Sequence, residues 1–249
     1  MRGGASRVCQ ESRAEGGCLS TSTTQTASDI DRLRDQLAQY GRKVLEQRLA
    51  TGAGGNISAC AGDTMLISPS GLSLEDTLPE QYVAVSLASG QILDSNALRP
   101  SSEVLMHLAI YRKRPEVRAI VHAHPQYTIA LTSSGHDLKP MFADAIVYLG
   151  QNVPHLEYIT VTTPELAAAV EARIGQSNAM VLRNHGAIAL GENLKYAFWR
   201  ACTLEEAAHI QLLATLVGTP VFLDAAEASR LEALSSEQYR RDLIARMVG

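Results

Sequence analysis

The stretch AIVHAHPQY, residues 119–127, places two histidines with a single alanine between them at the end of an apolar run. Val117, Ala119 and Val121 alternate with Arg118, Ile120, His122 and His124, and this alternation favours a strand over a helix. Successive side chains of a strand point to opposite faces, so residues i and i+2 share a face, whereas on a helix they point in different directions. We therefore expect His122 and His124 to lie on the same face of one strand.

Two imidazoles on one strand face form a two-ligand clip for a divalent cation such as zinc, iron, nickel or manganese, and an open catalytic site takes three protein ligands. His185 in LRNHGAIAL, residues 182–190, is the third candidate, because Gly186 allows another group to approach closely. Interpretations without a metal stay open. The strand histidines could do no more than pack and hydrogen-bond, and Asn-His-Gly could be no more than a hairpin turn. Surface or packing positions are expected for the remaining histidines, His107, His136, His155 and His209.

Glu103 and three turns of small residues complete the set of candidates. Glu103 lies in the first turn of a predicted helix, where a carboxylate is favoured by the helix dipole. It is either a first-turn charge that stabilises the helix or a general base beside a metal. The turns GGNIS (54–58), SPSG (68–71) and PSSE (100–103) expose backbone N–H groups, and the last opens a helix, which favours an anion. They match neither the Walker pattern nor the dinucleotide fingerprint, so they are either phosphate loops or unrelated surface turns.

The remaining sequence predicts strands and helices that interleave. A first helix begins with Ser28 as its N-cap, and a later one runs from the cap Thr163 and Pro164 to Gly175. Further strands are expected in TMLI (64–67), YVAVSL (82–87), QILD (91–94) and on both sides of the Asn-His-Gly turn, and further helices at about 101–114, about 194–216 and from about Ser236. This order favours an α/β domain with a mixed or mostly antiparallel sheet flanked by helices.

The composition is that of an ordinary globular protein: 249 residues, 46% hydrophobic, 19% charged and a formal net charge of -4. Weak acidity without a basic block gives no electrostatic case for nucleic acid or an anionic membrane, and no apolar run approaches the roughly 20 residues of a membrane helix. The four cysteines have no paired spacing, so we expect reduced thiols in a cytoplasmic protein. Residues 1–27 lack the apolar region of a secretory signal and predict a disordered extension before one domain over 28–249.

The order and spacing of GGNIS, SPSG, PSSE, HAHP and RNHG resemble the class II aldolase/adducin family, from about residue 30 to about residue 220. The resemblance implies a three-layer α/β/α sandwich around a mainly antiparallel, mixed sheet. It also implies a homotetramer with sites between subunits, and one divalent metal ion per subunit; we expect Zn²⁺, with Mn²⁺, Fe²⁺ and Co²⁺ as alternatives.

Carried over position by position, the resemblance makes His122, His124 and His185 the metal ligands and Glu103 the catalytic acid/base, which also touches the metal. It implies phosphate contacts from the small-residue turns, namely Gly55, Asn56, Ser70, Gly71, Ser101 and Ser102. The family's aldolases also use a tyrosine donated across the subunit interface; the ungapped match places Asp144 there, and Tyr148 fits only if the register shifts.

The reaction that the resemblance implies is cleavage of a ketose 1-phosphate to dihydroxyacetone phosphate and an aldehyde through an enediolate. Asp144 in place of the tyrosine leaves room for a decarboxylase of an oxo- or aromatic carboxylic acid on the same scaffold, whereas the intact turns favour a phosphorylated substrate. A non-catalytic adducin-like binding protein is the third alternative, and the presence of all three histidines argues against it.

Overall fold

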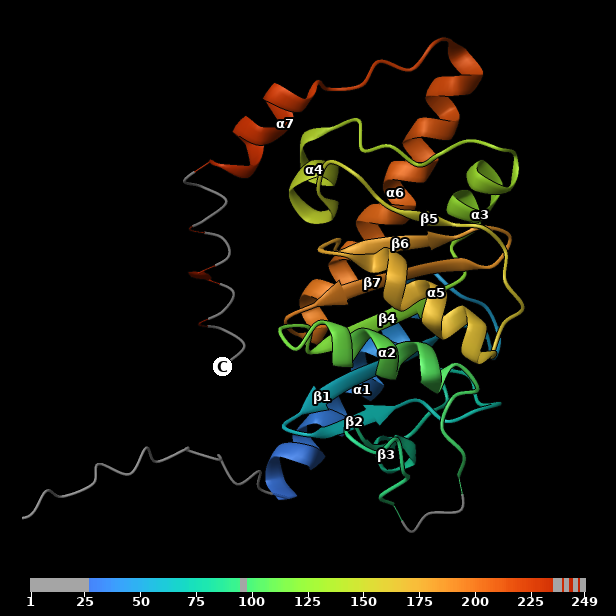
Figure 1. The fold of residues 1–249 in the computed structure, drawn as a ribbon, viewed down its shortest axis with the longest axis vertical. Helices are drawn as coiled ribbons and strands as arrows, with labels where there is room; N and C mark the ends of the chain where they lie inside the picture. The colour runs from blue at the N-terminus through green and yellow to red at the C-terminus, as the bar shows by residue number, and fades with distance from the viewer. Residues whose placement is uncertain (1–26, 95–97, 235–238, 240–241, 244–245, 247–249) are drawn as a thin grey trace, which may run out of the picture.

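The fold is built on a single seven-stranded sheet, shown in the computed structural model of Figure 1, which describes residues 27–94, 98–234, 239, 242–243 and 246. Within these residues the strand order is β3-β2-β1-β4-β7-β6-β5. The strands are β1 (Asn56–Ala61), β2 (Thr64–Ile67), β3 (Val83–Ser86), β4 (Ala119–Ala123), β5 (His155–Leu156), β6 (Ala179–Leu182) and β7 (Gly186–Gly191). The helices are α1 (Ala27–Glu46), the 3-10 turn η1 (Pro79–Gln81), α2 (Val104–Lys113), α3 (Gln126–Ser133), α4 (Ala143–Leu149), α5 (Pro164–Ile174), α6 (Leu194–Val217) and α7 (Ala225–Glu232).

Neighbouring strands are antiparallel throughout the described sheet except for β5 and β6, which run parallel. The predicted mainly antiparallel, mixed sheet is therefore confirmed. Strand β4 lies between β1 and β7, with His122 opposite Asn56 on one side and opposite Ile188 on the other. The two-histidine strand is thus a central strand, flanked by the strands that follow the first small-residue turn and the Asn-His-Gly turn.

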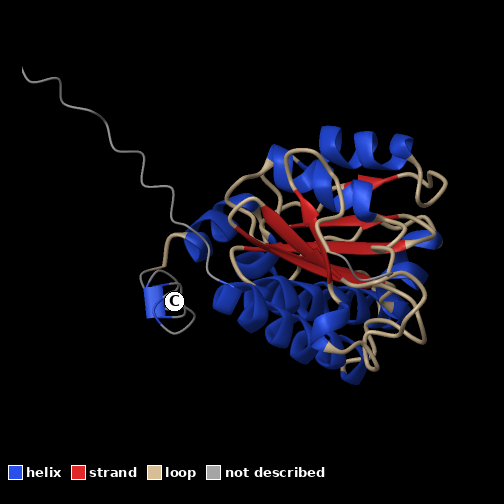
Figure 2. Ribbon diagram, turned by 90° about the horizontal axis from the view of Figure 1, so that it is seen from below, coloured by secondary structure: helices blue, strands red, loops and turns tan. Residues whose placement is uncertain are grey.

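Helices cover both faces of the sheet, which gives the expected α/β/α sandwich (Figure 2). Helices α2 and α5 lie on one face and pack against each other, while α1 and α6 lie on the other. Within β4 the side chains follow the pleat: Val121 packs with the cluster of α1 and α6, and Ile120 with the cluster of α2 and α5. His122 and His124 continue the alternation on the face of Ile120, toward α2.

Apolar burial on both faces fixes the register of this strand. Ile120 and Val121 are buried to 1% exposure or less, and a fully buried side chain of this kind stabilises the fold by about 1.5–3 kcal/mol. A slip of one residue would move every side chain of β4 to the opposite face and take both histidines away from α2. The same packing that forms the core therefore sets the direction of the two imidazoles.

Several predicted elements differ from those in the structure. QILD is not a strand, because Ile92 makes only an isolated bridge to Val85. Helix α2 begins at Val104 rather than near Ser101, and α1 already includes Ser28, which is therefore not an N-cap. The helices α3, α4 and α7 and the short strand β5 were not predicted. The expected disordered extension and most of the helix expected from about Ser236 lie outside the described residues.

Candidate metal centre

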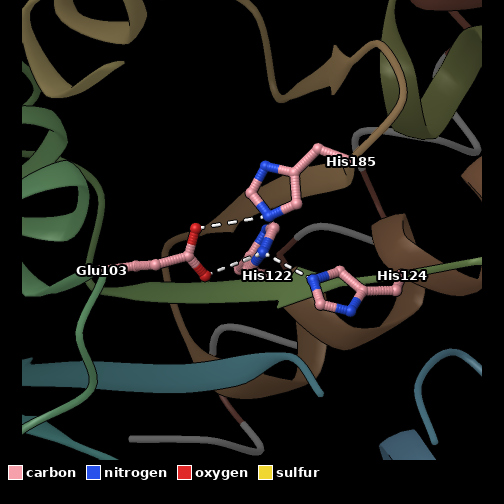
Figure 3. Close-up of side chains that lie close together, drawn as sticks. All are labelled: Glu103, His122, His124 and His185. Atoms are coloured by element: carbon pink, nitrogen blue, oxygen red, sulfur yellow. Dashed lines mark hydrogen bonds and ion pairs between the residues drawn. The ribbon is translucent and has the colours of Figure 1, made fainter. Parts of the chain in front are cut away.

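Three imidazoles and one carboxylate converge at the end of β4 (Figure 3). His122 belongs to β4, His124 follows the strand, His185 lies in the turn between β6 and β7, and Glu103 immediately precedes α2. One potential ligand atom of each residue lies within 4.8 Å of those of the other three. Glu103 Oε2 lies 3.0 Å from His122 Nε2, Glu103 Oε1 lies 3.3 Å from His185 Nε2, and His124 Nε2 lies 3.2 Å from His122 Nε2.

The backbone presents these rings at fixed orientations. His122 Nδ1 donates to the carbonyl oxygen of Ala187 at 3.0 Å, so in the neutral ring the lone pair of Nε2 faces the cluster. His185 is the third residue of a tight hairpin: its N–H donates to Leu182, and Asn184 adopts a left-handed φ of 59°, which asparagine tolerates. The hairpin reading of Asn-His-Gly is therefore correct, and the same hairpin brings His185 to the cluster.

The protonation states suit metal ligation. Burial, assisted by repulsion from His122 and opposed by Glu103, lowers the pKa of both His124 and His185 to about 4. Both rings are therefore neutral at pH 7, as ligands must be. Burial alone would raise the pKa of Glu103, but attraction to His122, the hydrogen bond with His122, attraction to His185 and the Asn56 amide together hold it below its usual range.

The donor set fits a divalent cation. Glu103 is only 8% exposed, and its Oε1 is buried without a hydrogen-bond partner while it faces an imidazole nitrogen. A buried ionised oxygen of this kind is costly unless it is paired, and a cation at the centre of the cluster would pair it. Three imidazole nitrogens and a carboxylate oxygen suit Zn²⁺, Mn²⁺, Fe²⁺ or Co²⁺. In the part of the chain that the structure describes, no other group of three or more His, Cys, Asp or Glu has this spacing.

A cleft of about 270 Å³ joins this cluster to the three small-residue turns. Glu103, His124 and His185 line it together with all six residues expected at a phosphate: Gly55, Asn56, Ser70, Gly71, Ser101 and Ser102. The backbone holds two of the turns together, because Ser70 donates to the carbonyl of Arg99 at 3.0 Å and Ser101 to that of Ser68 at 2.9 Å. The three turns are therefore neighbours in space and not unrelated surface turns.

Two glycines are required for this close packing. Gly55 adopts a φ of 73°, and a Cβ added there would lie 2.9 Å from the carbonyl oxygen of His122. A Cβ on Gly186 would collide with the carbonyl oxygen of Ala123 and lie 2.9 Å from His124 Cδ2. Both positions therefore need glycine so that the chain can pass beside the histidine strand.

Val161 and Thr162 also line the cleft, and neither was predicted to do so. Thr162 has a φ of 68°, a left-handed conformation that costs a β-branched residue about 1–3 kcal/mol. The stretch TVTTP, residues 160–164, does not predict that conformation, because threonine is among the residues least expected to adopt it. The tertiary structure imposes it.

The structure does not bring Asp144 into this cleft. Asp144 lies exposed in the first turn of α4, and it is not among the residues that line the cleft. The alternative Tyr148 is half-buried, and its ring meets that of Trp199 edge-on at 6.1 Å between centroids. The prediction for Asp144 concerned a residue donated across a subunit interface, so it stays a prediction about an assembly.

The other histidines stay outside the cluster, as expected of packing or surface residues. His209 stacks on Tyr127, and His155 Nε2 accepts from the backbone of Leu138. His107 is fully buried behind Glu103 and takes part in a hydrogen-bonded chain that the sequence did not reveal.

Comparisons with known proteins agree with this geometry. The sequence model described as "Class II Aldolase and Adducin N-terminal domain" matches residues 35–212. The chain is 36% identical over 204 residues to a 5-deoxy-D-ribulose 1-phosphate aldolase of Bacillus thuringiensis, covering 81% of this chain and 94% of the relative. It is 33% identical over 194 residues to a 3-oxo-tetronate 4-phosphate decarboxylase of Pectobacterium atrosepticum, covering 76% and 87%. A solved structure of an L-fuculose 1-phosphate aldolase superposes with a TM-score of 0.74 at 33% identity, covering 81% of this chain and 94% of that one.

Proposed function

This chain belongs to the class II aldolase and adducin family, and we propose that it is a metal-dependent carbon–carbon lyase that cleaves a ketose 1-phosphate to dihydroxyacetone phosphate and an aldehyde. The observation that carries the proposal is the single cleft that joins the histidine and glutamate cluster to three turns of small residues. The names of the relatives support a sugar phosphate as substrate, with a 5-deoxyketose 1-phosphate first to be tested.

The turns hold and orient the phosphate. They line the cleft with serines and glycines and without a lysine, and the turn that ends at Glu103 leads into α2, whose N-terminal dipole favours an anion. A phosphate fixed there places the carbon chain of the substrate across the cleft toward Glu103. Such positioning removes much of the entropic barrier to reaction.

Glu103 moves the proton at the carbon where the bond to the aldehyde breaks. Because its pKa is lowered, Glu103 is ionised at neutral pH and can act as a base. It takes the proton of the hydroxyl group that becomes the aldehyde oxygen as the carbon–carbon bond breaks, and it then delivers a proton to the carbon that keeps the electron pair of that bond. When bound, the divalent cation supplies a Lewis acid that stabilises negative charge developing on the substrate oxygens. His122, His124, His185 and Glu103 are the residues that would hold it.

A screen of the metal-reconstituted protein tests this function. Ketose 1-phosphates and phosphorylated oxo-acids are offered in parallel, and release of aldehyde and of carbon dioxide is followed for each. Aldehyde and dihydroxyacetone phosphate from a ketose 1-phosphate are the expected products. Carbon dioxide release alone would contradict the proposal.

Decarboxylation of a phosphorylated oxo-acid is the second candidate function. The decarboxylase relative at 33% identity favours it. So does the ungapped match to the family, which places Asp144 where its aldolases have a tyrosine. The two reactions share a phosphate site, a cation and a negatively charged intermediate, so the cleft alone does not separate them. In the screen, this candidate predicts carbon dioxide without an aldehyde.

A non-catalytic adducin-like protein predicts no tightly bound metal. Elemental analysis after purification without chelator distinguishes this class from an enzyme. We expect about one metal ion per chain, lost when His122, His124 and His185 are all replaced by alanine. A metal-free wild-type protein that cannot be reconstituted would support the non-catalytic alternative.

The finer properties of the molecule belong to the same proposal. Zn²⁺ is the expected ion, with Mn²⁺, Fe²⁺ and Co²⁺ as alternatives, and the assembly is a homotetramer in which a neighbouring subunit contributes Asp144. Residues 28–249 form one domain, and the enzyme acts in the cytoplasm. None of the helices in the described part of the chain is both long and apolar enough to span a bilayer.

A further inference from the structure

A chain of buried polar side chains runs behind Glu103, between β1 and α2. Asn56 and Ser58 lie two residues apart on one face of β1, and His107 and Tyr111 lie one turn apart on α2. Asn56 Nδ2 donates to Glu103 Oε2 at 2.8 Å, and Asn56 Oδ1 lies 2.6 Å from His107 Nε2. Ser58 Oγ lies 2.7 Å from His107 Nδ1 and 2.8 Å from the Tyr111 hydroxyl. All five side chains are buried, and His107 and Ser58 have no exposed surface.

The chemistry of the groups fixes the direction of every hydrogen bond in this chain. An ionised Glu103 only accepts, so Asn56 turns its NH₂ toward Glu103 and its oxygen toward His107. That oxygen also only accepts, so His107 Nε2 carries a proton. Burial, assisted by repulsion from His122, lowers the pKa of His107 to about 3, so the ring is neutral and Nδ1 accepts. Ser58 therefore donates to Nδ1, and its oxygen accepts from Tyr111.

We propose that His107 is a positioning residue for the metal centre: its Nε2–H locks the Asn56 amide, and the locked amide holds the Glu103 carboxylate with both oxygens facing the histidines. Without that donor the amide of Asn56 can turn over and present its oxygen to the carboxylate, which repels it. The inference rests on the proposed function, because it assigns to Glu103 the role of ligand and proton carrier.

Two substitutions at His107 separate positioning from packing. In His107→Gln the side-chain NH₂ reaches the place of Nε2 and can still donate to Asn56. In His107→Asn the shorter amide reaches only the place of Nδ1, so it contacts Ser58 and leaves Asn56 without its donor. Both replace the ring with an amide and leave a space, which is larger by one methylene group in His107→Asn. A role in packing alone would therefore lower the stability of both variants, somewhat more for His107→Asn, but it would not separate their affinities for a metal by tenfold or more.

The affinity for Co²⁺ is measured first, by titrating the metal-free full chain and following the visible absorption of the bound ion. We expect His107→Gln to bind Co²⁺ within about threefold of wild type and His107→Asn to lose roughly 10- to 100-fold, the usual cost of removing an outer partner of a metal ligand. Equal affinities of the two variants would overturn the proposal, whether both match the wild type or both are weakened.

Turnover gives a second measurement on the same variants. With the ketose 1-phosphate that the wild type cleaves, and at saturating metal, we expect kcat of His107→Asn to fall about tenfold or more, and KM to change less, because Asn56 is the only one of the expected phosphate contacts whose amide is released. His107→Gln should recover most of the loss. An unchanged kcat in His107→Asn would contradict the inference.

The tautomer of His107 tests the inference on the wild-type protein alone, so it does not depend on whether a variant folds. Long-range ¹H–¹⁵N spectra of the imidazoles should show a proton on Nε2 and none on Nδ1 between about pH 5.5 and 8. A proton on Nδ1 would overturn the proposed direction even if His107→Asn does not fold. Neither the spectra nor the Co²⁺ titration needs a substrate, so failure of the proposed reaction is distinguishable from failure of this inference.

Discussion

Glu103 accepts a hydrogen bond from Asn56 on the same oxygen that faces His122, and its second oxygen has only His185 nearby. We expect Glu103→Gln to lower kcat by about 100-fold or more, because the amide keeps the size of the side chain but cannot carry the proton. Glu171→Gln, an exposed residue of α5, is the control. Metal content is measured on both variants by elemental analysis. A Glu103→Gln protein with its metal and full turnover would refute the role given to this residue.

At the same scale, His107 makes the stability of the metal-free protein depend on pH. Its pKa of about 3 in the folded state lies below the usual value of about 6.5, so between these values the unfolded chain binds more protons. The free energy of unfolding therefore has its full value, as far as His107 is concerned, above about pH 6.5, and it falls as the pH drops from about 6.5 toward 3. Each histidine of this kind contributes a slope of up to about 1.4 kcal/mol per pH unit.

As the pH falls from about 5.5 to 4.5, we expect the free energy of unfolding of His107→Gln to fall less steeply than that of the wild type. The two slopes should differ by about 1 kcal/mol per pH unit, because one titrating group has been removed. Urea unfolding in the presence of a chelator measures it. His124 and His185, whose pKa values are about 4, keep a slope of the same sign in both proteins. The same slope in wild type and variant would show that His107 does not titrate in this way.

Single residues were predictable where the signal is local. The pair at His122 and His124 follows from strand periodicity alone, and its shared direction is seen in the structure. The role of His107 was not predictable, because its partners Asn56 and Ser58 lie on another element far away in the sequence. A histidine inside a helix looks the same in the sequence whether it faces solvent or a buried amide.

At the scale of elements, α3 depends on a residue of α6. This short helix begins two residues after His124, and its first N–H groups have no cap of their own. Glu205 of α6 accepts from the backbone of Tyr127 and Thr128 and from the Thr128 hydroxyl, each at 2.9 Å. The carboxylate thereby satisfies three donors and offsets the helix dipole.

We expect Glu205→Ala to lower the free energy of unfolding by about 1–3 kcal/mol, since it leaves these donors without a partner. Glu206→Ala removes the next carboxylate of α6, which is exposed, and should change stability by less than about 0.5 kcal/mol. Urea unfolding monitored by circular dichroism compares the two. Equal losses would mean that the cap contributes nothing.

Elements were predictable where packing agrees with a local pattern. α5 has its predicted cap, because Thr163 accepts from the N–H of Leu166, and its predicted end at Gly175. Helices α3 and α4 are short, and what stabilises them is contact with α6 rather than a pattern of their own. QILD has strand composition, yet without a neighbour to pair with along its length it forms only one bridge.

At the scale of the whole molecule, the proposed tetramer and the place of Asp144 are tested together by mixing subunits. One chain carries Asp144→Asn and the other carries alanine at His122, His124 and His185, so each alone should be inactive. If a neighbour supplies Asp144, co-expression should restore activity at about a quarter of the sites, where an intact metal centre meets an intact aspartate. Native mass spectrometry confirms mixed tetramers.

The control is a chain with all four substitutions, co-expressed with itself, which should show no recovery. Mixed tetramers without activity would mean that Asp144 does not act across the interface. A monomeric wild-type protein would refute the assembly itself. Fold and cleft could be predicted from one sequence because they lie within one chain, whereas the proposed role of Asp144 between chains rests on the resemblance alone.

The position of β4 between β1 and β7 also bears on the order of events during folding. The ligands come from three separate segments, and we expect them to meet only after β1 and β7 have paired with the central strand β4. Closing such distant pairings is the slow part of β-sheet assembly. During refolding from denaturant, we therefore expect metal binding to follow the collapse of the chain. A dye that reports free cation should show the cation being bound late in refolding, after the chain has become compact.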